Sequence, residues 1–170
     1  EIPASRQAAA SLALLALQRA FDEGEPYTEQ LAVLTRLAPE AEGVEALRAS
    51  ASEGAPTLAS LKAQFTPAVR NALAVSSGDG DNGLVSRVQK LVSVRPATPQ
   101  PGEEPSAVIS RAEANLDQDD LGGAVEELLA LSDGAADAFS GWLEAAQRRL
   151  TAAEAIETLN AALLDEYENQ

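Results

Sequence analysis

The chain has 170 residues, a mass of 17.6 kDa and a formal net charge of −15, from 27 acidic and 12 basic side chains. This charge repels phosphate backbones and argues against nucleic-acid binding through a broad basic face. The sequence has no histidine and no cysteine, which removes the usual general base, thiolate nucleophiles, disulfides and Cys/His zinc sites. We therefore expect no metal, no cofactor and no nucleic-acid partner.

The charge is distributed unevenly along the chain. Residues 1–53 carry a net charge of −5 and residues 103–170 carry −13, whereas residues 54–102 carry +3. This asymmetry suggests that the middle of the chain meets a different partner from the rest. The alternative is that its basic side chains form a helical face that pairs with the acidic C-terminal third.

The composition and the periodicity predict an all-α fold, a helical bundle with helix-turn-helix hairpins and a long C-terminal helix. Apolar residues make up 45% of the chain but aromatic residues only 4%, which favours packed helices over sheets. Helices are expected at residues 4–23, 28–38, 44–51, 58–65, 68–75, 84–93, 106–117, 121–131 and 135–167. The pair Thr66-Pro67 is interpreted as a cap and first turn that begins a new helix.

For two of the expected helices the sequence predicts which side chains are buried. In the first expected helix Leu12, Leu15, Ala16 and Arg19 follow helical spacing. Leu14, Leu17 and Phe21 widen this stripe until the helix is apolar most of the way round. We therefore expect this helix to be buried between neighbours. In the last expected helix, the single tryptophan, Trp142, is predicted to anchor the core rather than to bind a ligand.

Prolines at positions 96, 99, 101 and 105 predict an extended, semi-rigid connector. The sequence therefore divides into three regions. Residues 1–77 form an N-terminal helical region, and residues 78–105 contain a hinge, a basic amphipathic helix and the connector. Residues 106–170 form a C-terminal helical domain in which Asp120 is the expected N-cap of a hairpin helix.

The motifs associated with catalysis fail on their context. Residues 78–83 match the pattern G-x-G-x-x-G, but a helix precedes them and two carboxylates lie where a pyrophosphate would bind. The same stretch fails as a calcium loop because Gly83 and Lys90 occupy ligand positions. Paired acids such as Asp119 and Asp120 lie on predicted polar faces. We therefore predict a protein without catalytic activity.

Residues 84–95 form the one basic segment with a helical apolar stripe. This pattern is typical of a helix that lies in a membrane interface, with apolar side chains in the acyl boundary and bases toward anionic headgroups. The alternative is that the stripe packs on the domain's own core or on a partner chain. The candidate lipid-binding residues are Leu84, Val85, Arg87, Val88, Lys90, Leu91, Val92 and Arg95.

Several runs of sequence resemble the C-terminal region of alphaproteobacterial mitofilin. They are LVSVR (91–95) with the proline/glycine connector that follows it, AVISRAEA (107–114), DLGGAVEEL (120–128) and the helix with Trp142 and Leu143. Two upstream segments, ALLALQRAF (13–21) and GAPTL (54–58), are similar to the same proteins. The resemblance covers most of the chain.

The resemblance implies a membrane-shaping protein of the bacterial inner membrane. The family's N-terminal anchor and coiled coil are not in this sequence, so we expect a soluble fragment on the periplasmic side. The resemblance also implies contact with the outer-membrane β-barrel assembly machinery, lipid binding by the segment closest to residues 84–95, and self-association of the C-terminal domain.

For self-association, the candidate residues are Phe139, Trp142, Leu143, Leu150 and Leu159 on the long terminal helix. A homo-oligomer and an anionic membrane surface are thus the expected partners. The alternative function is a tetratricopeptide-like helical adaptor that binds proteins without touching the membrane. In that case residues 84–95 would be buried and lipid would have no effect on them.

Overall fold

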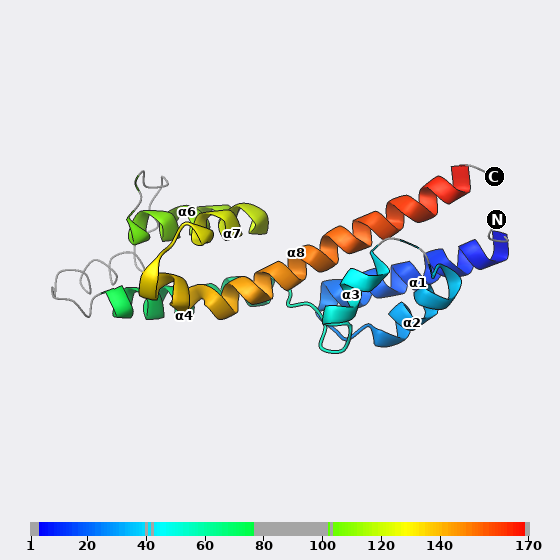
Figure 1. Cartoon of the computed structure of the whole chain (residues 1–170), viewed down its shortest axis with the longest axis horizontal. Coiled ribbons are helices and arrows are strands. Elements are labelled where there is room, and N and C mark those ends of the chain that lie inside the picture. The colour runs from blue at the N-terminus through cyan, green and yellow to red at the C-terminus, as the bar shows by residue number, and fades with distance from the viewer. Residues whose placement is uncertain (1–3, 40, 42, 77–101, 103, 169–170) are drawn as a thin grey trace. The chain divides into compact units, whose positions relative to one another are not determined.

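A computed structural model describes residues 4–39, 41, 43–76, 102 and 104–168. Within these residues the chain forms seven helices and no strand, so the prediction of an all-α bundle with a long C-terminal helix is confirmed. The helices are α1 (Ala4–Glu23), α2 (Thr28–Leu37), α3 (Val44–Ala51), α4 (Leu58–Ser76), α6 (Pro105–Asp117), α7 (Leu121–Leu129) and α8 (Asp133–Glu168) (Figure 1).

The helices belong to two compact units. Unit 1 comprises Glu1–Thr57 and Arg148–Gln170, and unit 2 comprises Leu58–Gln147. Helix α8 therefore contributes its first part to unit 2 and the remainder to unit 1. This division by contacts differs from the three sequence regions, which follow composition, because residues far apart in the sequence complete the same unit.

Unit 1 has its own apolar core, built by α1, α2, α3 and the second part of α8. Helix α1 packs against α2, and α2 packs against α3. The buried core residues are Ala10, Leu14, Leu17, Ala20, Phe21, Tyr27, Leu31, Leu34, Ala38, Val44, Leu47, Ala51, Ala55, Ala152, Ala155, Ile156, Leu159 and Leu163. All of them lie in the two segments of unit 1, so this core is complete without unit 2.

Polar contacts fix the start of α2 against the end of α3. The buried hydroxyls of Tyr27 and Ser50 are hydrogen-bonded to each other. The backbone N–H of Tyr27 and the hydroxyl of Thr28 both donate to the Ala51 carbonyl, at 2.9 and 3.0 Å. Satisfying these groups is what allows a tyrosine to be fully buried in an otherwise apolar core.

The start of α3 lies very close to α8. Gly43 has φ +94°, and a Cβ at this position would lie 2.6 Å from the carbonyl oxygen of Ala155. Glycine is required here both by the left-handed backbone and by the space available. Nearby, the Arg149 guanidinium stacks 4.4 Å from the ring centre of Phe21 and donates to the Pro56 carbonyl at 3.1 Å. These contacts hold α8 in unit 1.

Aromatic side chains form the centre of unit 2. The ring centroids of Phe65 and Phe139 are 5.6 Å apart, and those of Phe65 and Trp142 are 5.4 Å apart in an edge-on arrangement. The indole N–H of Trp142 donates to the Leu61 carbonyl at 2.9 Å. Trp142 is 5% exposed, which confirms its predicted role as a core anchor. The cluster joins the start of α8 to the middle of α4.

Helix α4 continues through Pro67, so the prediction of a new helix at Thr66-Pro67 is wrong. A proline inside a helix removes one backbone hydrogen bond and normally kinks or ends it. Here the turns on both sides are held by packing, because Leu61 and Phe65 before the proline and Ala72 after it are buried. Tertiary contacts outweigh the local signal to break the helix.

One face of α1 is exposed, which contradicts the prediction that this helix is buried between neighbours. Leu14, Leu17 and Phe21 are buried, but Leu12 is 68% exposed and Leu15 is 63% exposed. The core covers only one side of the helix. An apolar stripe in the sequence identifies a surface that avoids water but does not say whether a neighbour covers it.

Candidate functional site

The predicted lipid-binding segment, residues 84–95, lies outside the described residues. All eight candidate residues are in it: Leu84, Val85, Arg87, Val88, Lys90, Leu91, Val92 and Arg95. The structure does describe the chain on both sides of this segment. Helix α4 precedes it and α6 follows it, and both belong to unit 2. Unit 2 is therefore the part of the protein to which the candidate segment is attached.

On the downstream side, Arg111 fixes the start of α6. Its Nε donates to the Glu127 carboxylate at 2.8 Å, and its Nη1 donates to the Gly102 carbonyl at 2.8 Å. The Arg111 and Glu127 side chains are both only about a quarter exposed, which reduces screening of their attraction by water. This guanidinium ties residue 102, which follows the candidate segment, to helix α7.

On the upstream side, the last turn of α4 meets the first turn of α8. A Cβ at Gly134 would lie 2.3 Å from Cγ1 of Val75. The absence of a side chain at Gly134 is what permits this approach. Both attachment points of the candidate segment are thus held by contacts within unit 2 that depend on particular residues.

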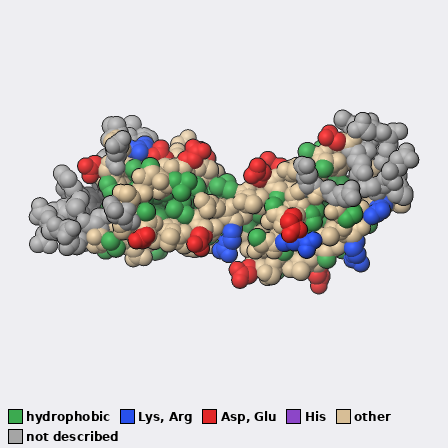
Figure 2. Space-filling model, viewed as in Figure 1, with side chains coloured by type: hydrophobic (Ala, Val, Ile, Leu, Met, Phe, Trp, Pro, Cys, Tyr) green, Lys and Arg blue, Asp and Glu red, His purple; other side chains and the backbone are tan. Residues whose placement is uncertain are grey.

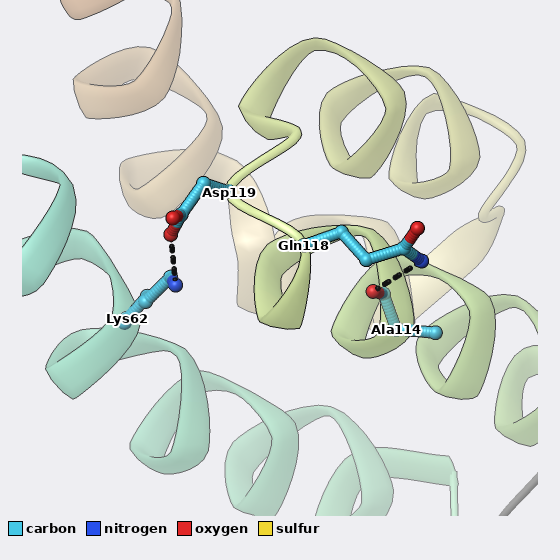
Figure 3. A network of polar contacts seen from close by, with 4 residues as sticks. All are labelled: Lys62, Ala114, Gln118 and Asp119. Carbon is cyan, nitrogen blue, oxygen red and sulfur yellow. Dashed lines mark hydrogen bonds and ion pairs between the residues drawn. The ribbon is translucent and has the colours of Figure 1, made fainter.

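The turn between α6 and α7 contains two acidic residues with different roles, and Figure 3 shows the first of them, Asp119, directed toward Lys62. Asp120 caps α7, because its Oδ1 accepts from the backbone N–H of Gly123 at 2.8 Å, and this confirms the predicted N-cap. Asp119 has φ +64° and forms an ion pair with Lys62 of α4. At the end of α6, the Gln118 side chain donates to the Ala114 carbonyl at 3.1 Å.

The residues predicted for self-association lie mostly inside the chain's own cores. Phe139 and Trp142 are buried in unit 2 and Leu159 is buried in unit 1. Leu143 and Leu150 are half-buried. The structure therefore does not bring these five residues together into one surface. Their role in self-association stays a prediction, and for the three buried side chains it would require exchange of α8 between copies.

The exposure of Leu12 and Leu15 on α1 is what sequence reasoning missed, because it placed both on a stripe expected to be buried. Leu12 and Leu15 belong to a series of exposed positions spaced alternately by three and four residues. This spacing is typical of a helix that packs along a seam against another helix. The buried residues Ala10, Leu14, Leu17 and Phe21 have the same spacing, so spacing alone does not separate the exposed face from the buried one.

The surface of the described residues carries both acidic and apolar side chains. Figure 2 shows acidic side chains spread over the visible face with apolar side chains between them. Among the described residues, no group of three acidic, histidine or cysteine side chains is arranged to hold a metal ion. In the same part of the chain, no helix combines the length and the hydropathy needed to cross a bilayer.

Comparison with known families supplies the identity of the chain. Residues 5–163 match the mitofilin family, described as a mitochondrial inner membrane protein. Comparisons with curated proteins and with solved structures gave no match. Mitofilins organise the inner membrane and are structural scaffolds rather than known enzymes. Because the match covers nearly the whole chain and both compact units, this protein belongs to the mitofilin family.

Proposed function

We propose that the protein is a non-catalytic scaffold module on the periplasmic side of a bacterial inner membrane, where it self-associates and contacts anionic lipid through residues 84–95. The observation that carries this proposal is the mitofilin match over residues 5–163. The local charge supports it, because residues 54–102 carry a net charge of +3 in a chain whose total is −15.

The charge distribution determines how such contact would work. Each base near an anionic surface contributes about 1 kcal/mol, so Arg87, Lys90 and Arg95 together supply about 3 kcal/mol. The acidic remainder of the chain is repelled by the same surface. Contact is therefore local, oriented and sensitive to salt. Because both neighbouring helices belong to unit 2, the bound segment would tether that unit to the bilayer.

Vesicle flotation tests the lipid contact. Wild type should float with vesicles that contain anionic phospholipid, and less protein should float as the salt concentration rises. The triple variant Arg87→Glu, Lys90→Glu, Arg95→Glu should remain at the bottom of the gradient. A matched triple variant, Arg36→Glu, Arg48→Glu, Arg70→Glu, changes three exposed bases on other helices by the same total charge and should float as wild type does. Equal behaviour of the two variants, or no flotation of wild type, would reject lipid contact through this segment.

The second candidate function is a helical adaptor of tetratricopeptide-like character. The antiparallel hairpin of α6 and α7, with its capped turn, is the observation that favours it. A single hairpin is less than the roughly three repeats that a solenoid needs to bury its surface, which is why we rank this function second. It predicts that lipid has no effect on residues 84–95, so that wild type stays unbound in the flotation experiment.

A further inference from the structure

Arg111 of α6 joins two parts of unit 2 that lie on either side of it in the sequence. Its Nε donates to the Glu127 carboxylate of α7, and its Nη1 donates to the Gly102 carbonyl, each at 2.8 Å. The guanidinium is planar and its donors point in fixed directions, so the contact with Glu127 determines where Nη1 lies. The backbone at Gly102 is therefore held at a defined position relative to α7.

The described residues just before α6 have restricted backbones. Gly102 has φ +132°, a conformation that residues with a side chain rarely adopt. Glu104 is the N-cap residue of α6, and its carbonyl accepts two backbone N–H groups of the first turn at 2.9 and 3.1 Å. Pro105 follows with the φ that its ring imposes. Local backbone chemistry thus sets how the chain enters α6, and Arg111 attaches the start of this entry to α7.

The two ends of the candidate lipid-binding segment differ in composition. Residues 77–83, on its upstream side, contain three glycines, which restrict a chain very little. Residues 96–101, on its downstream side, contain three prolines, and proline-rich connectors act as semi-rigid spacers. The composition therefore predicts that a fixed orientation passes between the segment and unit 2 on the downstream side, where the connector ends at Gly102.

We propose that Arg111 is a positioning residue, which fixes the orientation of unit 2 on the membrane by holding the downstream end of the connector against α7. This inference rests on the proposed lipid contact of residues 84–95. The bases of that segment supply the attraction to the bilayer. The Arg111 side chain is only about a quarter exposed and is bound to Glu127, so it adds little attraction of its own. Without its contact to Gly102, unit 2 would stay bound but would reorient about the connector.

The alternative is that Arg111 only stabilises the pair of helices α6 and α7 through its ion pair with Glu127. The two roles use different donors of one side chain and can therefore be separated. The charge-exchanged variant, Arg111→Glu with Glu127→Arg, restores an ion pair between the two helices. An ionised carboxylate at position 111 has no hydrogen to donate to the Gly102 carbonyl. This variant keeps the contact between the helices and loses the contact with the connector.

Time-resolved fluorescence anisotropy of Trp142 measures the orientation of unit 2 on vesicles that contain anionic phospholipid. Trp142 is the single tryptophan, and its ring is held in unit 2 by the hydrogen bond to Leu61 and by packing on Phe65. Its anisotropy therefore reports the motion of that unit. Bound wild type should keep a high residual anisotropy, because the vesicle rotates slowly. Arg111→Gln should bind vesicles to the same extent and lose much of this residual anisotropy.

Two further variants serve as controls. The charge-exchanged variant should lose residual anisotropy as Arg111→Gln does. Arg70→Gln removes an exposed base from α4 of the same unit and should keep the wild-type value. Circular dichroism without vesicles checks that each variant is folded. If Arg111→Gln does not fold, the charge-exchanged variant, which retains the ion pair, decides between the two roles.

The two proposals fail separately. If wild type floats but the residual anisotropy of Arg111→Gln equals that of wild type, the role of Arg111 is overturned and the lipid contact stands. Recovery of the anisotropy in the charge-exchanged variant would show that Arg111 acts only through its ion pair, and loss of flotation in Arg111→Gln would show that it supplies binding rather than orientation. Either result overturns the inference. If wild type does not float, the proposed lipid contact fails and the inference fails with it.

Discussion

At the scale of single residues, the fold depends on a few positions where the side chain has no alternative. Gly43 is required by its backbone and by the Ala155 carbonyl, and Trp142 combines a buried ring with a hydrogen bond to Leu61. Sequence patterns identified Trp142, because a lone tryptophan in an apolar helical stripe is usually core. They did not identify the constraint at Gly43, because it arises from Ala155 of α8, which is 112 residues later in the sequence.

Replacing Gly43 by alanine should destabilise unit 1. The new Cβ would lie 2.6 Å from a backbone oxygen and the residue would keep φ +94°, so a loss of about 1–3 kcal/mol is expected. The midpoint of urea unfolding, followed by circular dichroism, measures it. Gly141→Ala is the matched control, because a Cβ there meets nothing within 4 Å in a helix, and it should stabilise the chain by about 0.5–1 kcal/mol. An unchanged midpoint for Gly43→Ala would contradict the close approach.

Tyr27 should make the stability of unit 1 depend on alkaline pH. Burial raises the pKa of its phenol above the ordinary value, and the hydrogen bond with Ser50 only partly offsets this. Above about pH 10, tyrosine in the unfolded chain loses its proton while the buried one keeps it, so the free energy of unfolding falls as pH rises. In Tyr27→Phe this part of the decrease should disappear, although the variant is less stable at neutral pH because Ser50 loses its partner.

The measurement is the unfolding midpoint from neutral pH to above pH 10 in wild type, Tyr27→Phe and Tyr167→Phe. The last variant corrects for the second tyrosine of the chain. If wild type and Tyr27→Phe lose stability at the same rate above pH 10, the buried phenol does not control the effect.

At the scale of elements, the ends of most helices could be predicted because local chemistry decides them. Gly24, directly after α1, and Gly43, directly before α3, have left-handed backbone conformations. Asp120 caps α7 as its sequence position suggested. Two predictions were wrong, the helix break at Pro67 and the burial of α1, because both depend on whether neighbouring elements pack there. Burial on both sides of Pro67 keeps α4 intact, and no core residue covers the outer face of α1. Periodicity detects an apolar face but not its neighbour.

Pro67 should lower the stability of the helix that contains it. Pro67→Ala restores a backbone hydrogen bond in the interior of α4, where proline costs about 3 kcal/mol relative to alanine. The greater freedom of the unfolded alanine chain offsets about 0.5–1 kcal/mol of this gain. The urea midpoint of the variant should therefore rise. Thr66→Ala, at an exposed position in the same turn, should change the midpoint little, and a lower midpoint for Pro67→Ala would show that the proline supports α4.

At the scale of the whole molecule, the chain is organised as two units that share one long helix. The core of unit 1 contains no residue from 58–147, and the aromatic cluster of unit 2 contains none from outside that range. This organisation could not be read from the sequence, because composition marks the proline-rich connector more strongly than it marks the point in α8 where one unit gives way to the other. The candidate lipid segment was found because its charge contrasts with the rest of the chain, which is a local property.

Separate cores predict separate unfolding transitions. Trp142 is the single tryptophan and lies in unit 2, so its fluorescence reports that unit, whereas circular dichroism reports the helices of both. The two signals should give different midpoints in urea. Gly43→Ala should shift the circular dichroism curve toward lower urea and leave the fluorescence midpoint nearly unchanged. Coincident curves that move together would show instead that α8 couples the two units into one cooperative transition.

The shared helix also has a consequence for the order of events during synthesis. When α1, α2 and α3 leave the ribosome, their apolar faces lack Ala152, Ile156 and Leu159, which complete the core of unit 1. Residues 58–147 are translated before residues 148–170, and they can form the core of unit 2 during that time. The incomplete core of unit 1 therefore remains exposed to water for as long as the ribosome takes to translate unit 2. During this interval unit 1 is most accessible to a chaperone or to a second nascent chain.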